Sequence, residues 1–209
     1  MKFLCISDTH NEHNGLLLPP ADVIIHAGDA TTHGTEEECI AFLDWFRALD
    51  YECKIYVPGN HDKWIIRHNQ EMDLSGLNVL FHDEIMINGI RIIGTCQKDE
   101  RVLERFTFAP NPSILITHYP PKRILDSVDA GTKNYKATNG FPEFLGNRTI
   151  SDLVSQLKPA AHIFGHVHEW GGHDVVLGST HYFNVAVFDE YYRLVRPGGR
   201  VIEVNSEAS

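Results

Sequence analysis

Short apolar runs recur along the chain, and most of them end abruptly in polar residues. The runs are continuous instead of alternating with polar positions, a pattern that is typical of strands buried on both faces of a sheet. Five strands are therefore expected, over residues 3–6, 23–25, 54–57, 114–116 and 162–164. A loop containing Asp, Asn or His follows each of them directly.

Two further patterns predict paired strands. Residues 79–95 indicate a hairpin, because Asn88-Gly89 at its centre favours the tight turn that joins antiparallel strands. Residues 180–192 and 200–204 are both rich in β-branched and aromatic positions. We expect these two segments to pair with each other across the Pro197-Gly198-Gly199 turn.

Helices are fewer. Thr35 followed three positions later by Glu38 is a capping-box pattern, and apolar residues at helical spacing continue as far as Leu49. Residues 149–157 repeat this spacing before Pro159 ends it. Strands that alternate with helices, together with hairpins, predict an α/β fold with two mixed β-sheets.

Length and composition narrow the class of protein. With 209 residues, of which 43% are apolar, we expect one domain over residues 1–209. A net charge of −10 makes extended nucleic-acid binding an unfavourable hypothesis, since such binding depends on Lys and Arg. No apolar run approaches the roughly 20 residues of a membrane span, and the N-terminal segment becomes polar too early for a signal peptide. The expectation is a cytoplasmic protein without membrane association.

The loops after the five apolar runs carry short polar motifs. They are Asp8-Thr9-His10, Gly28-Asp29, Gly59-Asn60-His61-Asp62, Thr117-His118 and Gly165-His166-Val167-His168. Each motif is weak by itself, but ligands in α/β folds gather beyond the carboxyl ends of strands, so the five loops are expected to meet. Carboxylate, imidazole and amide donors suit Mn²⁺, Fe, Zn²⁺ or Ni²⁺, and they do not suit an all-oxygen Ca²⁺ cage.

The five motifs contain nine Asp, Asn and His side chains. Even seven of them are too many for one ion with an open position, and seven suffice for two ions that share a carboxylate. Two ions about 3.5–4 Å apart can clamp the attacking and leaving oxygens of a displacement at phosphorus. The pattern therefore favours hydrolysis of phosphate esters. No GxSxG motif offers a serine nucleophile as an alternative.

The ordered set D-x-H, GD, GNH[D/E], H and GHxH, over residues 8–168, resembles the signature of calcineurin-like metallophosphoesterases. Within that superfamily the chain is similar to the small metallophosphoesterase-domain phosphodiesterases of the brain type and their bacterial and viral relatives. The segments that carry this similarity are residues 5–10, 22–29, 44–46 and 162–169. The resemblance implies a four-layer α/β/β/α sandwich.

The resemblance also implies a role for each motif residue. The first ion would be held by Asp8, His10 and His168, the second by Asn60, His118 and His166, and Asp29 would bridge them. His61 and Asn60 would contact the substrate, and His61 would protonate the leaving oxygen. Asp62 would orient His61, and the alternative for Asp62 is a helix N-cap. The cofactors would be two divalent ions, with Mn²⁺ as the first choice and Fe, Ni²⁺, Zn²⁺ or Mg²⁺ as alternatives.

Four neighbouring features bear on this assignment. His166 is present where some animal relatives have Gly, so both ions are expected to be fully ligated. Tyr119 stands where many relatives have Gly, and it lines the cleft or simply fills space. Trp170 either stacks on a substrate base or packs. His26 and His162 lie within apolar strands and are expected in the core or behind the ligands.

The expected activity is that of a phosphodiesterase on nucleotide-type or other small diesters, by direct attack of a metal-bridging hydroxide. The alternatives are a nuclease or nucleic-acid end-processing phosphatase and, last, a non-catalytic scaffold. The only partner expected is a small phosphate ester, for example a nucleotide. The chain would be a monomer or a homodimer. Preference for monoester or diester depends on the loop at residues 122–148, whose conformation the sequence does not define.

Overall fold

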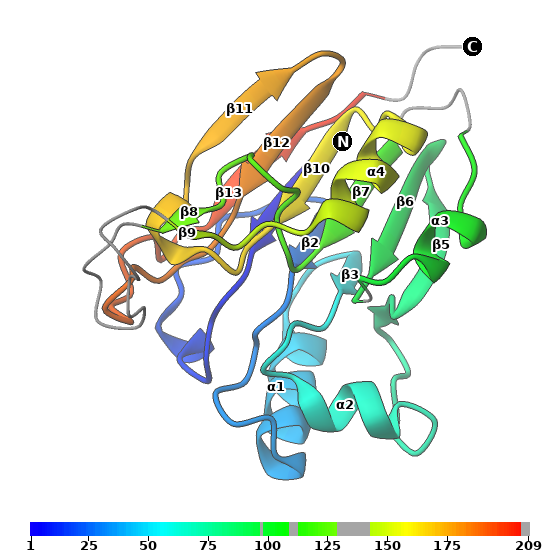
Figure 1. The fold of residues 1–209 in the computed structure, drawn as a ribbon. Helices are drawn as coiled ribbons and strands as arrows, with labels where there is room; N and C mark the ends of the chain where they lie inside the picture. The colour runs from blue at the N-terminus through cyan, green and yellow to red at the C-terminus, as the bar shows by residue number, and fades with distance from the viewer. Residues whose placement is uncertain (97, 109–112, 129–142, 206–209) are drawn as a thin grey trace.

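The computed structural model describes residues 1–96, 98–108, 113–128 and 143–205. Two β-sheets pack face to face, and helices cover the outer face of each sheet (Figure 1). These four layers confirm the expected α/β/β/α sandwich. Residues 129–142, the centre of the loop at 122–148, lie outside the described residues.

The first sheet has the strand order β13-β1-β2-β3-β4. Its strands are β1 (Lys2–Ile6), β2 (Val23–His26), β3 (Cys53–Tyr56), β4 (Asn78–Val79) and β13 (Arg200–Glu203). Strands β1 to β4 are parallel, and β13 runs antiparallel to β1. Helices α1 (Glu36–Ala48) and α2 (Lys63–His68) cover its outer face.

The second sheet has the strand order β11-β12-β10-β7-β6-β5. Its strands are β5 (His82–Ile87), β6 (Ile90–Thr95), β7 (Ser113–Thr117), β10 (Ala161–Phe164), β11 (Asp174–Leu177) and β12 (Thr180–Asn184). The four central strands are parallel, and both edge strands are antiparallel to their neighbours. Helices α3 (Arg101–Arg105) and α4 (Arg148–Leu157) cover its outer face.

Four short elements lie outside these layers. Strands β8 (Ser127–Val128) and β9 (Glu143–Phe144) form a small antiparallel pair. The 3-10 turns are η1 (His13–Gly15) and η2 (His168–Trp170). None of the helices in the described part of the chain is long and apolar enough to cross a lipid bilayer.

The continuous apolar runs arise because both faces of each sheet are covered. Along β1, Phe3 and Cys5 face the second sheet, whereas Leu4 and Ile6 face α1 and α2. All four side chains are fully buried. Burial of a large aliphatic or aromatic side chain contributes about 1.5–3 kcal/mol to the stability of the fold. Each strand therefore stabilises the packing of its sheet against both the other sheet and the helices.

The hairpin prediction is confirmed over residues 82–95, whereas Val79 belongs to β4 of the first sheet. Strands β5 and β6 pair over their full length, and Asn88 (φ 46°) and Gly89 (φ 80°) form the turn between them. Both positive φ values match the turn type that Asn-Gly favours.

The predicted pairing of residues 180–192 with residues 200–204 is wrong. Strand β12 pairs with β10 and β11 in the second sheet, whereas β13 pairs with β1 in the first. The chain changes sheets between them. Ser7 donates its backbone N–H to the carbonyl of Val185 (3.1 Å), and its own carbonyl accepts the N–H of Val187 (3.1 Å). These two hydrogen bonds connect the two sheets beside the loop that follows β1.

Helix α1 begins as the capping-box pattern predicts, with the hydroxyl of Thr35 accepting the N–H of Glu38 (3.3 Å). The Glu38 carboxylate, however, accepts the N–H groups of His33 (2.8 Å) and Gly34 (2.9 Å) and the side-chain amide of Asn11 (2.8 Å). Burial raises the pKa of Glu38, but these hydrogen bonds outweigh it and lower the pKa to about 2. Glu38 therefore ties the loop after β1 to the loop after β2.

Candidate metal centre

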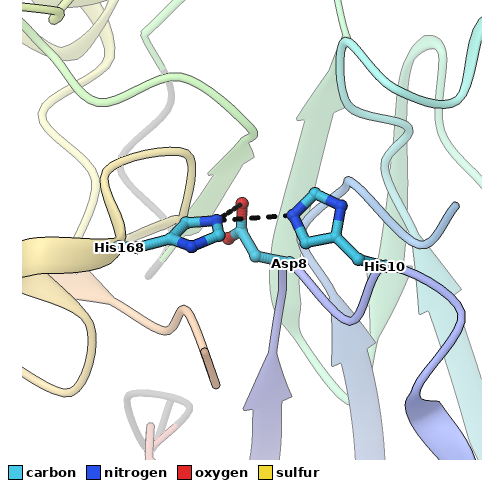
Figure 2. A group of neighbouring side chains, drawn as sticks. All are labelled: Asp8, His10 and His168. Atoms are coloured by element: carbon cyan, nitrogen blue, oxygen red, sulfur yellow. Dashed lines mark hydrogen bonds and ion pairs between the residues drawn. The ribbon is translucent and has the colours of Figure 1, made fainter. Parts of the chain in front are cut away.

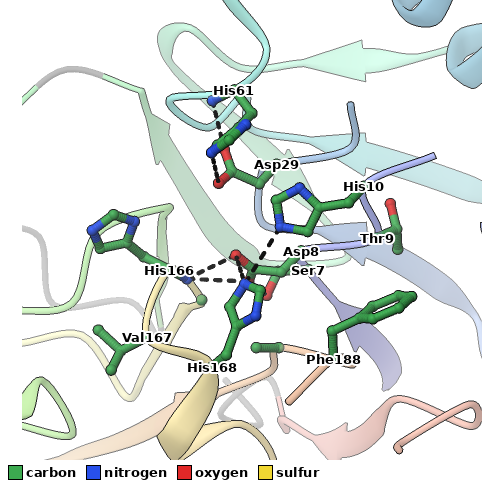
Figure 3. Close-up of polar contacts among 12 residues, drawn as sticks. Ser7, Asp8, Thr9, His10, Asp29, His61, His166, Val167, His168 and Phe188 are labelled. Atoms are coloured by element: carbon green, nitrogen blue, oxygen red, sulfur yellow. Dashed lines mark hydrogen bonds and ion pairs between the residues drawn. The ribbon is translucent and has the colours of Figure 1, made fainter. Parts of the chain in front are cut away.

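The parallel strands bring the five polar loops together at one edge of the sandwich. The loops follow β1, β2 and β3 in the first sheet and β7 and β10 in the second. The close-up in Figure 3 shows side chains from four of them pointing toward a common space. Residues that are distant in sequence thus converge because neighbouring parallel strands end at the same edge.

One group of metal-type donors consists of Asp8, His10 and His168, whose donor atoms all lie within 4.8 Å of one another. The Nε2 atom of His168 is 3.3 Å from Oδ1 of Asp8 and 3.4 Å from Nε2 of His10 (Figure 2). All three side chains are buried. This group matches the set expected for the first ion.

A second group consists of Asp29, His118 and His166, again with donor atoms within 4.8 Å. Nε2 of His118 is 3.2 Å from Oδ2 of Asp29 and 3.1 Å from Oδ1 of Asn60, so Asn60 adjoins this group. Nε2 of His61 lies 4.0 Å from the same Asp29 oxygen. The structure therefore places all seven candidate ligands and His61 in one region.

The two groups are in direct contact. The backbone N–H of His166 donates to both carboxylate oxygens of Asp8, at 3.2 and 3.1 Å. The imidazole rings of His10 and His61 lie 5.0 Å apart, centroid to centroid. A loop of the second sheet is therefore anchored on a carboxylate of the first.

Four imidazoles of the site turn Nδ1 toward a backbone carbonyl. The pairs are His10 with Thr31 (3.2 Å), His61 with Thr32 (2.6 Å), His118 with Ala27 (3.0 Å) and His168 with Asp189 (3.0 Å). A carbonyl oxygen only accepts, so each Nδ1 carries a proton and each Nε2 is directed into the site. Histidines that bind metals are usually oriented by such partners.

The donor atoms fit a cation. His10 and His168 have their Nδ1 protons held by carbonyls, so in the neutral form both Nε2 atoms present lone pairs to each other at 3.4 Å. The Asp8 carboxylate adds a third electron-rich atom. A cation or a shared proton relieves this crowding, and imidazole with carboxylate is a donor set that divalent transition metals prefer.

The buried pair Asp29 and His118 is likewise stabilised by a positive charge. Burial lowers the pKa of His118, but the Asp29 carboxylate outweighs it and raises the pKa to about 9. Burial alone would raise the pKa of Asp29, yet His118 holds it below its usual value. A proton on His118 supplies this charge, and a metal ion would displace that proton.

Backbone strain is concentrated at these ligands. Asp8 (φ 57°), His10 (φ 42°), Asp29 (φ 55°) and His166 (φ 68°) all occupy the left-handed region, which residues other than glycine rarely adopt. Strain of this kind persists where surrounding contacts enforce it, typically at functional sites. Here it occurs in the loops after β1, β2 and β10, which contribute residues to both donor groups.

Two glycines are required because carboxylates approach the backbone closely. A Cβ on Gly59 would lie 2.2 Å from Oδ1 of Asp29, and a Cβ on Gly165 would lie 2.1 Å from Oδ2 of Asp8. Neither carboxylate can retreat without leaving its donor group. Any side chain at these positions would therefore disturb the site.

Asp62 has contacts that differ from its expected role. Its carboxylate is buried and accepts the N–H of Gly59 (2.7 Å) and both the N–H and the hydroxyl of Thr31 (2.9 Å each). It caps no N–H of α2, although it occupies the N-cap position. The carbonyl of Thr32, and not Asp62, orients the imidazole of His61. Asp62 instead fixes the two loops that carry Asp29 and Asn60.

Asn184 is a structural partner that the motif analysis missed. Its side-chain amide donates to the carbonyls of Val167 (2.9 Å) and Gly165 (3.3 Å), and its oxygen accepts the N–H of Ala186 (3.1 Å). It thereby holds the loop that presents His166 and His168. The sequence signal for it is a single amide within the apolar run around residues 182–188.

His26 and His162 occupy matching positions behind the two halves of the site. Each is fully buried, and its Nε2 lies 2.9 Å from the hydroxyl of Thr9 or Thr117, respectively. Thr9 and Thr117 each adjoin a candidate ligand in sequence. Burial lowers the pKa of both histidines to about 3, so they are neutral near pH 7 and support the ligands from behind.

A cleft of about 170 Å³ opens onto the two donor groups. Five candidate ligands and His61 line it, together with Leu145, Glu169, Glu190 and Tyr192. Tyr119 does not line it and packs between the ring of His166 (4.5 Å) and the ammonium of Lys98 (3.9 Å).

Trp170 also lies outside the cleft lining. Its indole N–H donates to the carbonyl of Ser127 at 2.8 Å, which holds the ring against β8. These contacts favour the packing interpretation of Trp170 over a stacking role. Among the described residues, Tyr192 is the tyrosine that lines the cleft.

A four-layer sandwich with two adjoining donor groups at one edge defines a metal-dependent phosphoester hydrolase. Comparison with known proteins specifies the family. The chain belongs to the calcineurin-like phosphoesterase family, whose sequence profile matches residues 1–170.

Two relatives extend this match over most of the chain. Metallophosphoesterase domain-containing protein 1 of Homo sapiens is 29% identical over 235 aligned residues, covering 94% of this chain and 69% of that protein. The UPF0046 protein K07C11.7 of Caenorhabditis elegans is 31% identical over 216 residues, covering 89% of this chain and 69% of that protein. The similarity to the metallophosphoesterase-domain proteins is thus confirmed.

Solved structures support the fold. Phosphopantetheinyl hydrolase (PptH) from Mycobacterium tuberculosis superposes with a TM-score of 0.64 at 16% identity, covering 91% of this chain and 90% of that one. The protein TT1561 of Thermus thermophilus gives a TM-score of 0.63 at 15% identity, covering 98% and 99% of the two chains. At such identities the likeness shows the shared architecture alone.

Replacing Gly165 with Ala should weaken one metal site selectively. The added methyl group collides with the Asp8 carboxylate, so Mn²⁺ binding at the group of Asp8, His10 and His168 should fall about 10–100-fold. Titration calorimetry of metal-stripped protein measures this. Gly198→Ala is the matched control, because its Cβ would meet nothing closer than 3.8 Å. Two equally tight sites in Gly165→Ala would contradict the assignment.

Proposed function

We propose that this chain is a two-metal phosphodiesterase that hydrolyses nucleotide-type or other small diesters, with Mn²⁺ as its preferred ion. The observation that carries the proposal is that two donor groups and His61 line a single cleft. A phosphate in that cleft can contact both groups at once.

The ligand roles follow the contacts described above. Asp8, His10 and His168 would hold one ion, Asn60, His118 and His166 the other, and Asp29 would bridge them. Two bound ions would neutralise the phosphate oxygens and lower the pKa of a water molecule enough to supply the nucleophile, so no covalent enzyme intermediate is needed.

We assign His61 to the substrate and not to an ion, because it belongs to neither donor group. Thr32 holds its Nδ1 proton, so Nε2 is the atom that faces the cleft. About a third of the side chain (34%) is exposed, whereas Asp29 beside it is 4% exposed. The Nε2 atom can exchange a proton with the leaving oxygen or donate a hydrogen bond to the phosphate.

The charge of the cleft favours diesters over monoesters. Among the described residues, the cleft lining contains Glu169 and Glu190 but neither lysine nor arginine. The second negative charge of a phosphate monoester would therefore meet no basic side chain in the described part of this lining, and it would face the carboxylate of Glu190. A cytoplasmic location and a monomeric or homodimeric state stay predictions from the sequence.

Metal add-back tests the proposed function directly. Stripped protein should hydrolyse neither bis(p-nitrophenyl) phosphate nor p-nitrophenyl phosphate, and Mn²⁺ should restore activity with a higher kcat/KM for the diester. Ni²⁺, Zn²⁺ and Mg²⁺ are added separately for comparison. A preference for the monoester would refute the diesterase assignment. No activity with any ion would favour a substrate that is a nucleic-acid end, or a scaffold role.

His61→Ala should separate metal binding from catalysis. The metal content should stay near that of the wild type, because the imidazole of His61 is assigned to neither ion. Turnover of the diester should fall by about 10²–10⁴, the usual contribution of a general acid. His173→Ala, which removes an exposed imidazole outside the cleft, is the control. Loss of both ions in His61→Ala would show that His61 is a ligand instead.

A further inference from the structure

The outer wall of the cleft is a turn that is tied to a candidate ligand. The Asp189 carboxylate accepts the N–H groups of Tyr191 (3.0 Å) and Arg193 (2.9 Å) and the guanidinium of Arg193 (2.7 Å). The carbonyl of Asp189 accepts the N–H of Tyr192 (2.9 Å) and Nδ1 of His168 (3.0 Å). The turn therefore has a fixed position relative to the metal centre.

Tyr192 is held at the rim in a strained conformation. Its φ of 58° is unusual for a bulky residue, and its ring lies 5.1 Å from the rings of both His10 and His168. Yet 48% of the residue is exposed, and it lines the cleft. A half-exposed aromatic ring is thus placed directly beside two candidate ligands.

Glu190 precedes it and lines the same cleft. Within the described part of the chain, its carboxylate forms no hydrogen bond or ion pair. The nearby arginines are engaged elsewhere: Arg193 with Asp189, and Arg196 with the carbonyls of Ala186 and Phe188 (3.3 Å each). Glu190 thus forms no direct ion pair with either arginine among the described residues, although both arginines attract it at longer range.

We propose that Tyr192 and Glu190 form a subsite for a positively charged ester group, an amine or a quaternary ammonium, on the phosphodiester. This inference rests on the proposed function, since the phosphate must lie on the metal side of the cleft. A cation is attracted by the carboxylate and by the face of an aromatic ring. A neutral ring stacked on Tyr192 would leave Glu190 unpaired, and an additional phosphate would be repelled by it.

The substrate class that follows is a zwitterionic diester, with its anionic phosphate at the two donor groups and its cation at the rim. The anionic charge of such a molecule would meet the donor groups, and its cationic charge would meet Glu190 and Tyr192, which line the same cleft. Electrostatic matching of this kind gives selectivity by repelling wrong ligands as well as by attracting the right one.

Two chromogenic diesters with the same leaving group test the subsite. One is p-nitrophenyl phosphorylcholine, and the other is its neutral isostere, 3,3-dimethylbutyl p-nitrophenyl phosphate. In the Mn²⁺-loaded wild type, kcat/KM should favour the choline ester by about tenfold. This ratio should fall close to one in Glu190→Gln and should decrease in Tyr192→Ala.

The matched control is Glu203→Gln, which removes one negative charge at the opposite end of the sheet, where Glu203 pairs with Lys2 at the start of β1. Its ratio should equal that of the wild type. Equal kcat/KM values for the two esters in the wild type would overturn the subsite and leave the proposed function intact.

A second readout is independent of hydrolysis. Titration calorimetry of metal-stripped protein with choline should show binding that Glu190→Gln weakens several-fold and Glu203→Gln does not. Failure to hydrolyse either ester would refute the proposed function, and the subsite would then be judged by this titration. Choline affinity that is absent, or equal in the wild type and Glu190→Gln, would overturn the subsite.

Discussion

The rest of the site depends on one constraint: two aspartates, Asp8 and Asp29, are fully or almost fully buried at the edge of the sandwich. A buried carboxylate is costly unless a positive charge or several donors compensate it. The backbone N–H of His166 donates to the Asp8 carboxylate, and the ring of His168 lies beside it. The backbone N–H of His61 donates to the Asp29 carboxylate, and the ring of His118 lies beside that one. The two carboxylates therefore organise all the loops around them.

The same constraint accounts for features that look unrelated. Gly59 and Gly165 leave room for the carboxylates, and the left-handed backbone of the ligand loops turns donors toward them. Carbonyls behind the imidazoles set the tautomer that directs Nε2 inward. After β12 the chain passes beside Ser7, and backbone hydrogen bonds between Ser7 and residues 185 and 187 join the two sheets. These bonds hold in place a donor group whose residues come from both sheets.

Much of this organisation could be predicted from the sequence. Continuous apolar runs define strands covered on both faces, and the motif at the end of each strand identifies the candidate ligands. The pairing of β12 with β13 was predicted wrongly, because strand propensity carries no information about which sheet a segment joins. The roles of Thr32 and Asp189 were missed because their backbone carbonyls act there, and every residue has one.

Tyr192 and Glu190 could not have been assigned from the sequence either. No motif surrounds them, and their position in the cleft depends on the turn that Asp189 organises. A tyrosine in such a segment is compatible with packing, a dimer surface or a substrate contact. Its exposure and its neighbours, on which the proposed role depends, arise only in the folded chain.

The central claim is that two ions share one cleft with Asp29 between them. Crystals grown with Mn²⁺ and measured near the manganese absorption edge test it directly through anomalous difference maps. The account predicts two peaks about 3.5–4 Å apart, one at Asp8, His10 and His168 and the other at Asn60, His118 and His166, with the Asp29 carboxylate touching both. A single peak, or two peaks that share no carboxylate, would contradict it.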